Sequence, residues 1–207
     1  MALAVTRPTW GLGFGDEVWW SRLAQPAIHT WAPTKQAVRL IEKAWSNADP
    51  EPKALACYGL LVRHVPIPPE QMLLRFVERR PVSRETTAFL AWCSECLAAQ
   101  GLTARLLLWD NASWHISKAV RPWLRQHNQK VKQTGQGVRI LACRLPSKSP
   151  WLNPIAPKWV HGTRAIVEPD RVLSAQEGRE RVYAYSGGAA EAHLAISEKA
   201  ACHALGD

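Results

Sequence analysis

Two aspartates have the residue type and the positions that metal-dependent phosphoryl chemistry needs. Asp16 lies within one segment that reads as a strand, and Asp110 follows another, far away in the sequence. Carboxylates brought together on adjacent strands repel each other unless a divalent cation lies between them. Mg²⁺ is bound by one or two carboxylates with phosphate oxygens and water, and a pair of such ions can promote displacement at a phosphodiester. The spacing leaves a second interpretation open: Asp110-Asn111 forms an ordinary turn after a strand, and Asp16-Glu17 is solvated.

Basic residues gather around the second aspartate. The 207 residues include 26 Lys+Arg and 17 Asp+Glu, a formal net charge of +9. Residues 103–165 hold 11 basic side chains and a single acid, Asp110. The basic residues are Arg105, Lys118, Arg121, Arg125, Lys130, Lys132, Arg139, Arg144, Lys148, Lys158 and Arg164. A solvated face would explain such a run, but one carboxylate in a strongly basic field suits a phosphodiester site, so nucleic acid is the favoured partner.

Composition favours a globular protein of the cytoplasm. A hydrophobic fraction of 47% excludes wholesale disorder. No apolar run approaches the roughly 18 residues that span a bilayer, and residues 1–10 lack the pattern of a signal peptide, so we expect no membrane partner. Five cysteines are an odd number, which favours a reducing cytosol over a secreted disulfide framework. Cys93 and Cys96 have the spacing of a metal-binding pair, but without a second close pair we interpret them as the inner face of a helix.

Hydrophobic periodicity predicts the elements that position the aspartates. Strands are expected over residues 12–20, 54–62, 105–109 and 138–143, with a further short strand possible over 28–31. Helices are expected over 68–79, over 83–101, after Ser117 with Pro122 kinking the helix or delaying its start, after Asn153-Pro154, and from a capping box at Ser174–Glu177. Ala156 then falls in the first turn of the fourth helix. This order predicts an α/β fold with a mixed sheet flanked by helices, whose function gathers at the strand ends.

Three stretches of sequence carry a resemblance to a known family. Residues 106–124 (LLLWDNASWHISKAVRPWL) and 138–171 (VRILACRLPSKSPWLNPIAPKWVHGTRAIVEPDR) resemble the catalytic core of bacterial insertion-sequence transposases in the mariner-related DDE superfamily, and the insertion sequence six-thirty family in particular. Residues 11–31 (GLGFGDEVWWSRLAQPAIHTW) resemble the first catalytic strand of that family. The resemblance runs from about Gly11 to Ala201, and its most specific parts are DNASWH and LPSKSPWLNP.

This resemblance implies a fold, a reaction and partners. It implies a ribonuclease H-like fold, with a catalytic domain over residues 1–185 and a C-terminal tail over 186–207. It also implies two Mg²⁺ ions, for which Mn²⁺ could substitute, and DNA strand cleavage and joining at transposon ends and target. Intact relatives are expected to act as a dimer or other homo-oligomer.

Individual residues receive roles from this interpretation. Asp16 and Asp110 match the first two catalytic, metal-binding acids of the family. Lys118, Arg121, Lys148 and Lys158 are expected to contact the DNA backbone. His115 is expected to contact phosphate or to support the metal site, with a histidine that merely caps its loop as the alternative.

Two departures from the family pattern predict impaired activity. The third family acid is a Glu directly after Leu-Asn-Pro-Ile, and here that position is Ala156. Glu168 lies 12 positions further on, roughly 18 Å along a helix, so neither it nor Asp170 can easily substitute. The sequence before Trp10 also cannot hold the helix-turn-helix region that recognises transposon ends in the family.

Three hypotheses follow from these departures. The first is an N-terminally truncated transposase catalytic domain with weakened metal affinity and little or no activity. The second is a non-catalytic DNA-binding or subunit-interaction remnant of a transposase. The third is a decayed reading frame without a role.

Overall fold

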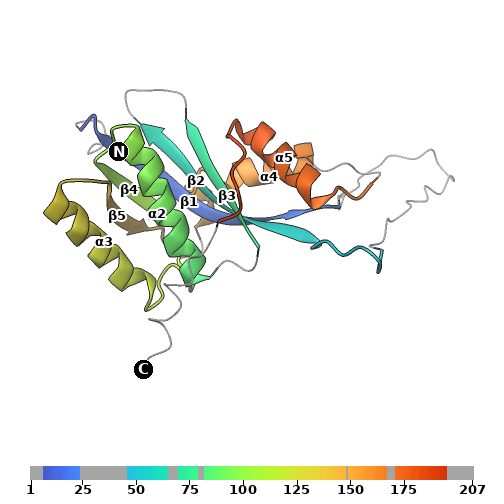
Figure 1. Cartoon of the computed structure of the whole chain (residues 1–207), viewed down its shortest axis with the longest axis horizontal. Coiled ribbons are helices and arrows are strands. Elements are labelled where there is room, and N and C mark those ends of the chain that lie inside the picture. Colours follow the sequence, from blue (N-terminus) through green and yellow to red (C-terminus); the bar gives the residue numbers. More distant parts are fainter. Residues whose placement is uncertain are drawn as a thin grey trace.

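A mixed β-sheet forms the centre of the molecule (Figure 1). The computed structural model describes residues 7–23, 46–64, 70–78, 82–147, 149–166 and 171–194. Within these residues the sheet has five strands in the order β3-β2-β1-β4-β5. They are β1 (Trp10–Ser21), β2 (Ala54–His64), β3 (Gln71–Val77), β4 (Ala104–Trp109) and β5 (Arg139–Arg144). β1, β2 and β3 pair antiparallel, whereas β4 pairs parallel to both β1 and β5. The predicted mixed α/β sheet is therefore confirmed.

Helices cover the two faces of this sheet, and the described part of the chain has two α-helices on each face. α2 (Ser83–Ala99) and α3 (Val120–Thr134) share a buried core with the side chains of Leu60 and Leu107. α4 (Ala156–Ile166) and α5 (Ala175–Ser186) share a second core with Phe14 and Leu61. Figure 1 shows α2 and α3 together on one side of the strands and α4 beside α5 on the other. Since side chains alternate along a strand, Asp16 lies on the same face as Phe14 and therefore on the side of α4.

Most of the elements expected from periodicity are present. The strands expected over 12–20, 54–62, 105–109 and 138–143 correspond to β1, β2, β4 and β5, with ends that differ by at most two residues. The possible strand over 28–31 lies outside the described residues. Among the described helices, none is long and apolar enough to cross a membrane.

The helix expected over residues 68–79 is wrong. Residues 71–77 form β3, which pairs with β2 from Val62↔Gln71 to Ala56↔Val77. The helical interpretation rested on prolines at 68 and 69, which are also common before a strand. β3 lies between two helical layers, so its side chains are buried on both faces, as Leu73 is in one core and Phe76 in the other. A strand in this position is apolar on both faces and lacks the alternating pattern by which a strand is usually predicted.

Local capping fixes where the helices begin. Ser174 Oγ accepts a hydrogen bond from the Glu177 N–H at 3.1 Å, so the predicted capping box opens α5. Ser117 Oγ accepts from the Val120 N–H at 3.2 Å, and α3 starts at Val120, which leaves Pro122 in the first turn where proline is tolerated. The sequence also makes Ser83 a candidate N-cap for the helix expected over 83–101, but Ser83 is the first residue of α2 and Val82 is its N-cap.

The described residues that follow α5, 187–194, return to the β3 edge of the sheet. α5 ends at Gly187 in the left-handed conformation. The Leu194 N–H then donates to the Phe76 carbonyl at 2.9 Å, and the Leu194 side chain is buried in the α2–α3 core. The domain boundary expected at residue 185 stays a prediction.

Candidate active site

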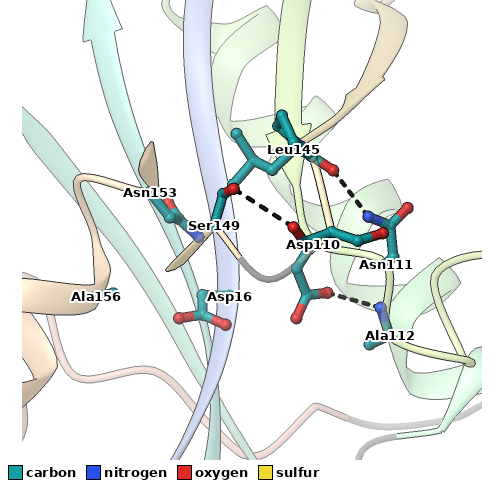
Figure 2. A pocket seen from close by; sticks show the side chains of 10 residues that line it. Asp16, Asp110, Asn111, Ala112, Leu145, Ser149, Asn153 and Ala156 are labelled. Atoms are coloured by element: carbon teal, nitrogen blue, oxygen red, sulfur yellow. Dashed lines mark hydrogen bonds between the residues drawn. The ribbon is translucent and has the colours of Figure 1, made fainter. Parts of the chain in front are cut away.

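The structure brings Asp16 and Asp110 to one pocket. β1 and β4 run parallel, and their last paired residues are Phe14 and Leu108. Asp16 and Asp110 each follow two residues later, so both carboxylates emerge at the same edge of the sheet. They line a cavity of about 380 Å³ together with Ser149, Asn153 and Ala156. Figure 2 shows the two carboxylates on the same side of this pocket.

Asp16 is the more buried of the two aspartates. Its Oδ2 accepts a hydrogen bond from the Trp159 indole Nε1–H at 3.1 Å. The partner of Asp16 on β2 is Gly59, and the Trp159 ring occupies the space that a side chain at Gly59 would fill. Burial, with the nearby charges of Glu17 and Asp110, raises the pKa of Asp16 to about 7. A carboxyl group in this position favours either a proton or a cation.

Asp110 is half-exposed, and one of its oxygens is held from two sides. Its Oδ1 accepts hydrogen bonds from the Ala112 N–H at 2.9 Å and from His115 Nδ1 at 2.8 Å. The hydrogen bond from His115 is the main cause that lowers the pKa of Asp110. The bond to Ala112 is the turn that the sequence suggested as an alternative. Asp110 therefore makes this turn and lines the pocket as well.

His115 bridges the two acids that flank it. Its side chain is only 2% exposed and stacks on Trp109 with ring centroids 4.4 Å apart. Nε2 lies 2.8 Å from Glu17 Oε1, and Nδ1 faces Asp110. Burial alone would lower the pKa of His115, but the hydrogen bonds to Asp110 and Glu17 outweigh it and raise the pKa to about 9. Neither ring nitrogen is open to a phosphate in this arrangement.

Glu17 is a site-associated residue that the sequence reasoning missed. Sequence reasoning placed Glu17 only in the alternative in which Asp16-Glu17 is solvated, whereas its side chain is 8% exposed. The signal was present in the strand alternation, because consecutive residues of β1 must face opposite sides of the sheet. Glu17 pairs with Tyr58, a member of the α2–α3 core, and so it lies behind the sheet as seen from Asp16.

Ala156 lines the pocket at the position where the family pattern places its third acid. It is the first residue of α4, and its N–H donates to the Asn153 carbonyl at 3.1 Å. The buried Asn153 amide donates to the Gly15 carbonyl at 3.2 Å, which ties the start of α4 to β1 directly before Asp16. Asn111 makes an analogous tie between the loops after β4 and β5, since its Nδ2 donates to the Leu145 carbonyl at 2.7 Å (Figure 2).

Of the four predicted DNA contacts, the three that the structure describes do not line this pocket. Lys118 and Arg121 are exposed at the start of α3. Lys158 lies in α4, where its Nζ forms an ion pair with Glu70 at 3.0 Å. Lys148 lies outside the described residues. A DNA contact by any of these residues stays a prediction.

The donor set of the pocket fits a divalent cation of the hard type. Asp16 and Asp110 supply carboxylate oxygens, and burial together with the charges of Glu17 and Asp110 raises the pKa of Asp16. Mg²⁺ and Mn²⁺ prefer such oxygen ligands. The described residues contain no group of three His, Cys, Asp or Glu side chains that could hold a metal ion. The fit therefore rests on two carboxylates.

Comparisons with known proteins agree with this architecture. Residues 71–177 match a family described as DDE superfamily endonuclease, a span that includes Asp110 and Ala156 and begins after Asp16. The fold is similar to that of the Mos1 transposase in its paired-end complex with the left transposon end, with 14% identity and a TM-score of 0.54 over 88% of this chain and 48% of that one. The Mos1 strand transfer complex gives 12% identity and a TM-score of 0.55 over the same shares.

A third structure, the Mos1 mariner paired-end complex with Mn, gives 14% identity and a TM-score of 0.50 over 87% of this chain and 48% of that one. This chain thus spans about half the length of these solved structures. At such identities the likeness establishes the fold, which is the ribonuclease H-like α/β fold. No curated protein matches the sequence.

Proposed function

This chain belongs to the DDE superfamily endonucleases, and from that premise we propose that it is the catalytic domain of a transposase whose activity Ala156 impairs. Its substrate would be DNA, at the ends and target of an insertion sequence of the mariner-related six-thirty family, in the cytoplasm. The observation that carries the proposal is the composition of one pocket. Three sites on β1, β4 and α4 converge there, and two of them carry carboxylates while the third carries the methyl group of Ala156.

The residues of the pocket have separable roles. Asp16 and Asp110 would hold Mg²⁺ or Mn²⁺, which when bound supplies Lewis-acid stabilisation of charge on a phosphodiester. The Trp159 indole N–H orients the Asp16 carboxylate from the side of α4. The side-chain amide of Asn153 donates a hydrogen bond to β1, and that of Asn111 donates one to the loop after β5. These two hydrogen bonds hold the three pocket walls in fixed positions relative to one another.

Ala156 limits this site because a methyl group donates no ligand. A pocket with three carboxylates offers enough oxygen ligands to hold two divalent ions together with phosphate oxygens and water, whereas two carboxylates bind fewer ions or bind them more weakly. The backbone around position 156 is held independently of its side chain, through Asn153 and the N–H of Ala156. A glutamate introduced at this position therefore starts from the first turn of a helix that already faces the pocket.

The test compares the chain as it stands with Ala156→Glu and Ala156→Gln. Nicking of supercoiled plasmid is measured in Mg²⁺ and in Mn²⁺, and Mn²⁺ affinity is measured by electron paramagnetic resonance. We expect Ala156→Glu to raise nicking by about 100-fold or more, since a ligand of the metal pair is restored. Ala156→Gln adds the same bulk without the charge and is expected to remain near the parent rate. Nicking by the parent as fast as by Ala156→Glu would overturn the proposed impairment.

A second candidate function is favoured by the same alanine together with the exposed basic residues of α3. In this alternative the chain is a non-catalytic DNA-binding or subunit-interaction module. It predicts duplex binding that weakens steeply with salt and has little sequence preference. If Ala156→Glu restored neither Mn²⁺ binding nor nicking while DNA binding remained strong, this alternative would replace the first.

A further inference from the structure

We propose that Glu17, which lies on the opposite face of β1 from Asp16, is a positioning residue that acts through His115 to fix the carboxylate of Asp110 for a divalent cation. The inference rests on the proposed function for the presence of that cation. It concerns residues that do not themselves line the pocket wall. The evidence is a continuous chain of contacts from one side of the sheet to the other.

The first link is the loop that follows β4. The Asp110 Oδ1 accepts from the Ala112 N–H, and the His115 N–H donates back to the Ala112 carbonyl at 3.0 Å. This tight turn returns the His115 ring over Trp109, where the two rings stack at an interplanar angle of 15°. The ring is held on its face by Trp109 and at its edges by the two carboxylates, so its orientation is fixed.

The second link is the pair of hydrogen bonds at the ring edges. Glu17 Oε1 and Asp110 Oδ1 each lie 2.8 Å from a ring nitrogen. These contacts hold the ring at two opposite edges, while Trp109 holds its face. Glu17 thus anchors the edge of the ring that lies away from Asp110 and keeps Nδ1 directed at Asp110 Oδ1.

The third link is the consequence for Asp110. Its Oδ1 is occupied by two N–H donors, from the backbone of Ala112 and from His115. The described residues place no such donor on Oδ2, and this oxygen lies toward Asp16 in Figure 2. A half-exposed aspartate would otherwise sample several rotamers, and the loss of that freedom on binding would weaken a cation site.

The experiment measures Mn²⁺ affinity in the Ala156→Glu chain, with Glu17→Gln as the principal variant. Glutamine preserves the size of Glu17, but its neutral amide makes a weaker hydrogen bond to the ring than the carboxylate does. We expect Mn²⁺ to bind about 10-fold more weakly, as is typical when the hydrogen-bond partner behind a metal ligand is removed. The matched control is Glu85→Gln, a buried acid in the first turn of α2, which should leave Mn²⁺ affinity unchanged.

A double-variant comparison separates positioning from general damage to the fold. His115→Asn retains a donor near the Nδ1 position but cannot reach Glu17. If Glu17 acts through His115, adding Glu17→Gln to His115→Asn causes no further loss of affinity. Losses that multiply, or a folded Glu17→Gln chain with parent affinity, would overturn the inference.

A measurement without metal keeps the inference independent of the proposed function. Carbon-13 relaxation of the Asp110 side chain in the metal-free parent chain should show a single ordered rotamer, and Glu17→Gln should increase the amplitude of its motion. An Asp110 side chain that is equally ordered in the parent and in Glu17→Gln would overturn the inference. Failure of both the parent and Ala156→Glu to bind Mn²⁺ would instead overturn the proposed function, and the relaxation measurement would still decide whether Glu17 orients Asp110.

Discussion

Two corners of the pocket, one at Asp110 and one at Ala156, are each held in place by hydrogen bonds, but only the first presents a carboxylate to the cavity. In the corner after β4, the backbone of Ala112 and the ring of His115 hold the Asp110 carboxylate. In the corner before α4, the buried Asn153 and the ring of Trp159 hold the helix start against β1, yet the side chain presented to the cavity is that of Ala156. The difference teaches that the contacts that position a catalytic side chain can be separate from the side chain itself.

The physical reason lies in where the hydrogen bonds are anchored. At the Asp110 corner they end on the carboxylate, so a change of Asp110 would remove both donors' partner. At the Ala156 corner they end on backbone carbonyls of Gly15 and Asn153 and on Asp16. The α4 corner therefore loses no polar contact when position 156 is alanine. Four sets of substitutions test this difference between the two corners.

The largest effect is expected where α4 meets the sheet. A Cβ at Gly59 would lie 2.4 Å from the Trp159 ring, so Gly59→Ala must displace the ring that contacts Asp16. We expect a loss of about 3 kcal/mol in the free energy of unfolding, as for overpacked cores, and a Tm lower by about 8 °C. Gly188→Ala is the control, because its Cβ would meet nothing closer than 3.6 Å. Equal urea unfolding curves for the two variants would contradict the close packing of Trp159 of α4 against Gly59.

The packing of Trp159 on Gly59 shows which parts of the site could be predicted from the sequence and which could not. Strand alternation placed Asp16 on one face of β1, and the end of β4 placed Asp110, so the meeting of the two carboxylates was predictable. The pairing of Gly59 with Asp16 was not, because it depends on the β1–β2 register across intervening residues. The helix expected over 68–79 failed for a related reason, since non-local pairing with β2 overrode the local proline signal.

The second prediction is that replacing Asp16 and replacing Asp110 change the stability of the fold in opposite directions. The pKa of Asp16 is raised from 3.8 to about 7, mainly by burial. The folded chain therefore keeps this proton longer than the unfolded chain, and stability falls as pH rises from about 4 to about 7. Asp16→Asn removes that loss, so at pH above 7 we expect the variant to be more stable by on the order of 2 kcal/mol.

The corresponding change at Asp110 should have the opposite sign. Its pKa is lowered, first by the hydrogen bond with His115, so its contribution to stability is present above its ordinary pKa and is lost as pH falls through the lowered value. Asp110→Asn is therefore expected to melt below the parent at neutral pH. Thermal melts of the parent and both variants from acidic to alkaline pH provide the measurement. Two variants that shift Tm in the same direction at about pH 8, below the pKa of about 9 of His115, would refute the contrast.

The third effect is the loss of stability when the hydrogen bond of Asn153 or that of Asn111 is removed. Asn153→Ala leaves the buried Gly15 carbonyl without its amide donor, which costs about 1–2 kcal/mol. Asn111→Ala removes a tie from a half-exposed side chain, where water can take its place, and we expect less than about 1 kcal/mol. Chemical denaturation of both variants measures the difference. A larger loss for Asn111→Ala would mean that the loop after β5, and not the start of α4, is the more tightly held wall.

The smallest expected effect is a difference between Lys118 and Lys158 in the salt dependence of DNA binding. Lys118 is exposed in the turn before α3, so if it contacts a phosphate, Lys118→Ala should reduce the slope of log affinity against log salt by about 1 for duplex DNA. Lys158 is already paired with Glu70, and a phosphate must compete with that carboxylate. Lys158→Ala is therefore expected to reduce the slope by a smaller amount, as measured by fluorescence anisotropy across a salt series.

Glu70→Gln tests the reason for this inequality. The variant removes the competing charge from Lys158, and it also leaves Arg63, the other partner of Glu70, without its acid. The slope should become steeper, and the gap between the Lys118→Ala and Lys158→Ala effects should close when each is measured in the Glu70→Gln background. If Lys158→Ala has the smaller effect in both backgrounds, the ion pair is not the cause. The α4 corner would then lie outside the DNA footprint, and the contrast between the two corners would extend from metal ligands to the binding surface.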